Sequence, residues 1–96
     1  MILPLHVDVH AFTRGSDDDV RDGLLGYLQL VVGERLLLDG ITLRQTEEGR
    51  KALSFPTRTD RRGQKHSLIR PTTNEARIAI ERAVLERLAV LRGIDR

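Results

Sequence analysis

His6, Asp8 and His10 are the first residues in the chain whose types and spacing could bind a metal ion. They alternate with apolar residues, so in a β-strand all three side chains point to the same side. At about 3.3 Å per residue the two histidine Cα atoms lie about 13 Å apart, whereas zinc needs ligand nitrogens about 2.0–2.1 Å away. One ion is therefore a poor fit for both imidazoles, and a His–Asp pair supplies too few ligands. We interpret these residues as the solvated face of a strand.

A run of aspartates at 17–19, followed by Asp22 and Gly23, suggests calcium, because this ion prefers carboxylate oxygens. A loop of the EF-hand type needs spaced oxygen ligands, a central glycine and a glutamate at its twelfth position. Those offsets are absent. We therefore interpret residues 13–23, which are rich in aspartate and glycine, as a solvated acidic loop.

Nucleophiles and acid–base pairs form no enzymatic motif in this chain. Its serines lie outside any G-x-S-x-G sequence, and Gly23 and Gly26 lack the lysine and the spacing of a phosphate-binding loop. Glu47 and Glu48 are paired carboxylates, but they fall at the exposed tip of a predicted hairpin. The sequence predicts that the protein is not an enzyme and uses no cofactor, metal or small-molecule substrate.

The densest charge in the chain is basic and lies between residues 50 and 70. Seven lysines and arginines occur there against a single acidic residue, Asp60. A guanidinium group can donate two hydrogen bonds to one phosphate, so clustered arginines form an anion-binding site. Thr57, Thr59 and Ser67 add neutral donors. The candidate nucleic-acid-binding residues are Arg50, Lys51, Arg58, Arg61, Arg62, Lys65 and Arg70.

The distribution of charge along the chain points to a polyanionic partner. Residues 1–40 carry three basic and seven acidic side chains, whereas residues 41–96 carry thirteen and seven. A solvated positive face explains this asymmetry equally well. Phe12, Tyr27 and Phe55 are the only aromatic residues and lie outside the basic loop, so base stacking is poorly supported. Contacts to the backbone of duplex DNA or structured RNA fit better.

Alternating and turn-forming residues predict an antiparallel sheet. Residues 3–12 alternate, with Leu3, Leu5, Val7, Val9 and Ala11 on one face. Gly33 and Glu34 suit a two-residue type II′ hairpin turn, and residues 45–49 close a second hairpin. The later strands end at prolines, which cannot donate to a ladder. The predicted strands are residues 3–12, 24–32, 35–44, 50–55 and 64–70, with a loop over 57–63.

The last predicted element is a helix. Thr72 and Glu75 have the spacing of a capping box, and Gly93 suits the helix end. The pairs Arg77/Glu81 and Arg82/Glu86 lie at i,i+4 and are predicted on the solvent side. Apolar residues recur at three- and four-residue steps and form one stripe: Ala76, Ile80, Ala83, Val84, Leu88 and Leu91. A sheet of four or five antiparallel strands followed by one long C-terminal helix is an α+β fold.

The 96 residues predict a single domain spanning residues 1–96. The chain has no cysteine, which excludes a disulfide framework and thiolate metal sites. Its first residues lack the basic start and the length of a signal peptide, and no stretch approaches the roughly 20 apolar residues that span a bilayer. We expect a cytoplasmic protein that does not bind membranes.

One helix is too little to cover both faces of this sheet. Leucines occupy both faces of the central hairpin, between residues 24 and 38. A second apolar face predicts self-association. We expect a homodimer that forms through the sheet surface or the sheet edges.

The order of residues from Pro56 to Arg77 resembles the SpoVG family, the stage V sporulation protein G or septation regulator group. The family motif runs approximately Pro-Ser-Lys-Arg-x-x-x-Gly-x-Phe-x-Asp-Ile-x-His-Pro-Ile and precedes a helix with an arginine near its start. Its counterparts here are Pro56-Thr57-Arg58, Gly63, Leu68-Ile69-Arg70-Pro71 and Arg77, without a gap. The chain departs from the motif with Lys65 for Phe, Ser67 for Asp and Arg70 for His.

The resemblance implies an antiparallel sheet, a C-terminal helix, a dimer, and binding of DNA or RNA to regulate gene expression or septum placement. By position, Arg58 inherits the nucleic-acid-binding role directly. Arg61, Arg62 and Lys65 are assigned the same role only because they lie close to Arg58 in the sequence. The residues and the resemblance together predict a non-enzymatic, dimeric nucleic-acid-binding regulator. The alternatives are a protein-interaction adaptor in cell division or gene regulation and, third, a small hydrolase or metal protein.

Overall fold

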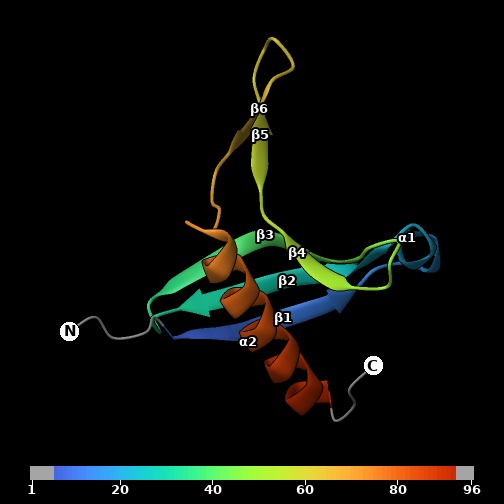
Figure 1. Ribbon diagram of the computed structural model, residues 1–96, viewed down its shortest axis with the longest axis vertical. Coiled ribbons are helices and arrows are strands. Elements are labelled where there is room, and N and C mark those ends of the chain that lie inside the picture. The colour runs from blue at the N-terminus through green and yellow to red at the C-terminus, as the bar shows by residue number, and fades with distance from the viewer. Residues whose placement is uncertain (1–5, 93–96) are drawn as a thin grey trace.

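The structure, a computed structural model, describes residues 6–92 and has the predicted α+β fold. Four antiparallel strands form the main sheet in the order β1-β2-β3-β4, and α2 lies across one face of it (Figure 1). A second sheet contains β5 and β6 alone. Residues 3–5 of the predicted first strand, and Gly93, lie outside the described residues. The elements are β1 (Val7–Arg14), α1 (Asp17–Arg21), β2 (Leu24–Val32), β3 (Leu36–Gln45), β4 (Lys51–Ser54), β5 (Thr57–Thr59), β6 (Lys65–Ser67) and α2 (Asn74–Arg92).

The hydrophobic core lies between the main sheet and α2. The middle of the predicted helix stripe is confirmed, because Val84 and Leu88 are buried and Ile80 packs beside them. The end of the stripe is not, since Leu91 is 53% exposed. The buried apolar residues come from β2, β3, β4 and α2: Leu28, Leu30, Ile41, Leu43, Leu53, Val84 and Leu88.

The alternation predicted for the first strand breaks at a β-bulge. The register of β1 on β2 shifts between Val9 and Ala11, so the residues after the shift exchange faces. Phe12 packs against the core, while Ala11, predicted to face inward, is exposed. A Cβ at Gly26 would lie 2.5 Å from the Phe12 ring, so the glycine makes room for that ring.

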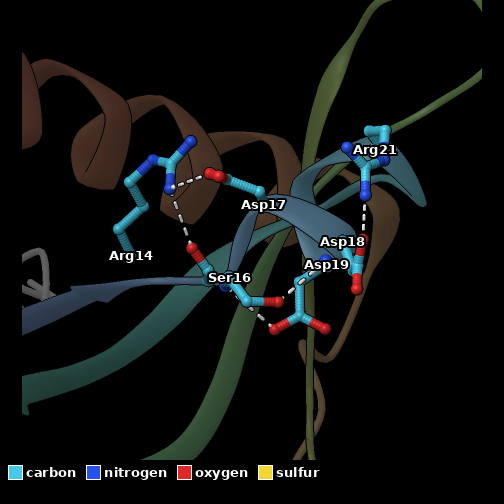
Figure 2. Close-up of polar contacts among 7 residues, drawn as sticks. Arg14, Ser16, Asp17, Asp18, Asp19 and Arg21 are labelled. Atoms are coloured by element: carbon cyan, nitrogen blue, oxygen red, sulfur yellow. Dashed lines mark hydrogen bonds and ion pairs between the residues drawn. The ribbon is translucent and has the colours of Figure 1, made fainter.

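The prediction of a loop over residues 13–23 is wrong, because β1 continues to Arg14 and α1 follows. Ser16 and Asp19 form a capping box: the Asp19 N–H donates to Ser16 Oγ at 3.0 Å, and the Ser16 N–H donates to Asp19 Oδ2 at 3.1 Å (Figure 2). Asp17 pairs with Arg14 and Asp18 with Arg21. The aspartates therefore stabilise the start of a helix, where the helix dipole favours negative charge.

The turns confirm the two hairpins of the main sheet but change the length and type of the first turn: Val32 pairs with Leu36, so three residues connect β2 to β3 instead of the predicted two. Gly33 and Glu34 have φ values of 60° and 63°, and the Arg35 N–H donates to the Val32 carbonyl at 3.3 Å. Positive φ at both central residues is the type I′ pattern, not the predicted type II′. The second hairpin turns at residues 46–49, as predicted.

The start of α2 differs from the prediction by one residue. The Ala76 N–H donates to Thr73 Oγ1 at 3.0 Å, so Thr73 caps the helix and the Thr72–Glu75 capping box does not form. Arg77 and Glu81 do pair, at 3.5 Å, but Glu81 is only 6% exposed and does not lie on the solvent side. Among the described residues no ion pair joins Arg82 to Glu86.

The fifth predicted strand does not join the main sheet. Part of the predicted loop forms β5, and β5 pairs with β6 as an independent antiparallel hairpin. This hairpin projects away from the main sheet and from α2 (Figure 1). We call residues 57–67 the arm.

Candidate nucleic-acid interface

The arm presents almost its whole surface to solvent. Residues 57–70 are exposed apart from Asp60, which is half-buried. The Leu68 N–H donates to the Pro56 carbonyl at 3.1 Å and closes the base of the arm. Pro56 also ends pairing with the main sheet, because it has no N–H to donate. The basic residues of the arm are thereby held away from the rest of the chain.

The register of β5 on β6 sorts the arm residues onto two faces. Thr57 pairs with Ser67 and Thr59 with Lys65, so one face carries three hydroxyl groups and an ammonium group. Arg58 pairs with His66 and occupies the opposite face. This follows because directly paired residues share a face and neighbours in a strand alternate.

The single carboxylate of the arm is used by the arm itself. Asp60 Oδ1 accepts hydrogen bonds from the backbone N–H groups of Arg62, at 2.8 Å, and Gln64, at 3.0 Å. Its Oδ2 lies 2.8 Å from His66 Nε2. The hydrogen bond with His66, followed by those from the turn, lowers the pKa of Asp60 below its ordinary value of 3.8. Asp60 therefore shapes the turn and pairs with none of the arginines.

The cations of the arm make no ion pair with the side chains that the structure describes. Arg61 and Arg62 lie in the turn at the tip, Arg58 on β5 and Lys65 on β6. Arg70 follows β6 in the exposed segment that leads to α2. The sequence-based candidates Arg58, Arg61, Arg62 and Lys65 are thus brought together, and their charges stay available to an anion.

Arg50 and Lys51 are not brought to the arm. Lys51 begins β4 and Arg50 directly precedes it, whereas the arm follows the end of that strand. Arg50 Nη1 lies 3.6 Å from Glu81 Oε1, so this arginine already has a carboxylate partner. The two residues form a separate part of the basic surface.

One polar residue of the arm was missed in the sequence, and Arg77, outside the arm, has contacts that the sequence did not predict. His66 was not proposed, although its six-residue separation from Asp60 across a turn is a signal for a cross-strand pair. Arg77, which the family motif singles out, has a structural role: its Nη1 donates to the Leu53 carbonyl at 3.2 Å and its guanidinium lies 5.9 Å from the Phe55 ring centroid.

The other candidate residues lie in structural contacts or in an exposed turn, and Asp8 contacts α2 instead of lying on a solvated face as predicted. Asp8, from the His-x-Asp-x-His sequence, accepts a hydrogen bond from Arg87 Nε at 2.8 Å. No group of three potential metal-binding side chains gathers within residues 6–92. Glu47 and Glu48 lie in an exposed turn. No helix in the described part of the chain is long and apolar enough to cross a membrane.

Comparison of the chain with protein-family models, with curated proteins and with solved structures finds no match. The interpretation of the interface therefore depends on its own geometry and charge.

Proposed function

We propose that this chain is a non-enzymatic nucleic-acid-binding regulator that contacts phosphate groups through the arm. One observation carries the proposal: within residues 6–92 the exposed side chains of Arg58, Arg61, Arg62 and Lys65 have no carboxylate partner, while Asp60 binds the turn of the arm and His66. Arginines and hydroxyl groups are the usual donors to phosphate oxygens. The resemblance to the SpoVG family, with its roles in septation and sporulation, stays a prediction.

The number of phosphates contacted sets how steeply salt weakens binding. Each neutralised phosphate adds about −0.9 to the slope of log affinity against log salt. Four cations of one arm predict a slope of about −4, and the arms of a dimer predict about −7. The slope therefore distinguishes a protein that uses one arm from one that uses two.

The double substitution Arg61→Ala with Arg62→Ala tests the proposal. We expect affinity to fall by about tenfold or more on every duplex DNA or structured RNA, and the salt slope to become shallower by about 2 for each arm that contacts the nucleic acid. The fold should not change, because both side chains are exposed at the tip. Mobility-shift titration at two salt concentrations, with circular dichroism of the variant, measures both effects.

Arg35→Ala is the matched control, since it removes one exposed arginine from the β2–β3 turn. It should change affinity far less than the arm variant. Absence of any shift by the unmodified protein at low salt would refute nucleic-acid binding. The protein-interaction adaptor, with the arm on an acidic protein, would then become the leading hypothesis.

A further inference from the structure

We propose that the arm enters the major groove of B-form duplex DNA and places cations against the phosphates of both strands. The inference rests on the proposed function and specifies its ligand. The supporting observation is the position of the basic side chains on the two faces of a two-stranded ribbon, not their number.

The cations of the arm lie on both faces of the ribbon. Lys65 shares a face with Thr59, whereas Arg58 lies on the other face with His66. Cations on opposite faces are poorly placed to meet a single row of phosphates together. A duplex groove offers two rows, one on each wall, and a ribbon inserted between them meets both.

The dimensions of the arm fit the major groove of B-form DNA better than the other grooves of duplex DNA or RNA. A two-stranded ribbon has strands about 4.8 Å apart, and with its side chains it fits the major groove of B-DNA, about 12 Å wide. The minor groove, about 6 Å wide, is too narrow. The major groove of A-form RNA is deep and narrow and does not admit it. From Thr57 to Asp60, where the turn begins, the arm extends about 10 Å at 3.3 Å per residue, which exceeds the groove depth of about 8.5 Å.

The composition of the arm argues against a protein partner. No apolar side chain occurs from Thr57 to Ser67, whereas the buried centre of a protein interface is apolar and rich in aromatic residues. The hydroxyl groups of Thr57, Thr59 and Ser67 can donate to phosphates, and so can Arg58 on the other face. Both faces of the ribbon are therefore chemically suited to groove walls.

Four 24-base-pair probes of one sequence test the groove assignment by mobility shift. They are the plain DNA duplex, the duplex with bulky glucosylated cytosines in its major groove, the duplex saturated with netropsin in its minor groove, and the RNA duplex. We expect the plain and netropsin-bound duplexes to bind equally. The other two should bind at least tenfold more weakly. Equal binding to the glucosylated duplex, or to the RNA, would overturn the inference.

An exchange of neighbouring residues tests the requirement for two faces. Gln64 directly precedes β6, and its carbonyl accepts the Asp60 N–H at 2.9 Å, which continues the ladder. Gln64→Lys with Lys65→Gln therefore moves the cation to the Arg58 face without changing composition or net charge. We expect this double variant to lose as much affinity for the plain duplex as Lys65→Ala does. Affinity equal to that of the unmodified protein would show that only net charge matters and would contradict groove insertion.

The two failures are distinguishable. If the unmodified protein binds none of the four probes at low salt, the proposed function fails. If it binds all four alike, phosphate binding stands and the groove assignment is wrong.

Discussion

Glu81 is the residue on which the contact between α2 and β4 depends. Its buried carboxylate accepts the Leu53 N–H at 3.0 Å and pairs with Arg77 and Arg50. Arg77 donates to the carbonyl of the same Leu53. Glu81 and Arg77 of α2 therefore bind the N–H and the carbonyl group of Leu53, which would otherwise be open to an adjacent strand.

Removal of this carboxylate should be costly. Glu81→Ala leaves the Leu53 N–H without its acceptor, and we expect about 2–3 kcal/mol lower stability in urea denaturation. Glu81→Gln keeps an acceptor oxygen and should lose about half as much. Glu86→Ala, at an exposed position on the same helix, is the control and should stay within about 0.5 kcal/mol. Equal effects of Glu81→Ala and Glu86→Ala would contradict this role.

Asp60 makes the turn of the arm sensitive to acid. Its pKa in the folded protein lies below the ordinary value of 3.8, chiefly because of the hydrogen bond with His66. The carboxylate therefore stabilises the turn above that value, and its contribution is lost as pH falls through the lower, folded pKa. NMR titration of the Asp60 carboxyl carbon should give a midpoint below 3.8, and His66→Ala should raise it. A midpoint at or above 3.8 in the unmodified protein would contradict the pairing.

At the scale of elements, side chains of α2 reach one position on each edge strand of the main sheet. On β4 it supplies Glu81 and Arg77 to Leu53. On β1 the Val9 N–H donates to Asp8 Oδ1 at 2.8 Å, and Arg87 of α2 holds the same oxygen. Open edges are templates for pairing with another chain, and occupied backbone groups remove that template. At Leu53 and Val9 a second chain would therefore have to displace these side chains before it could pair with the sheet edge.

The regular periods in the sequence predicted most elements. Alternation and turn residues located β2, β3 and β4, and the three- and four-residue steps located α2. The bulge in β1 could not be predicted, because an extra residue leaves no mark until the partner strand is known. The capping box at Ser16 was overlooked because glycine and aspartate around it favour a loop.

For the candidate site, the sequence predicted where the basic residues lie in the chain but not how the arm arranges them. The sequence predicted the exposure of Arg58, Arg61, Arg62 and Lys65, because clustered like charge avoids the core, but it wrongly grouped Arg50 and Lys51 with them. Their division between two faces depends on the pairing of Arg58 with His66. That register was not predicted, since residues 57–63 were expected to form a loop. The engagement of Asp60 also needed the turn geometry.

At the scale of the whole molecule, we propose that a second copy covers the sheet face opposite α2. Val31 pairs with Leu37, and alternation places both opposite the core residues Leu30 and Leu38. Leu37 is 49% exposed and Tyr27 47% exposed. These exposed apolar side chains make this face a suitable surface for the homodimer that the sequence predicts.

Sedimentation tests the dimer. At micromolar concentration we expect a species of about twice the 10.9 kDa monomer mass. Leu37→Glu should shift it to the monomer by placing a charge in the apolar interface. Val90→Glu, at a 68% exposed position on α2, is the control and should leave the dimer intact. A monomer in the unmodified protein would refute the proposal.

The most direct test of nucleic-acid binding by the arm is an NMR titration of the isotope-labelled protein with a duplex DNA at low salt. We predict that the largest changes in backbone amide shifts fall within residues 57–67 and disappear at high salt. Changes confined to the main sheet or α2, or no changes at all, would contradict the account.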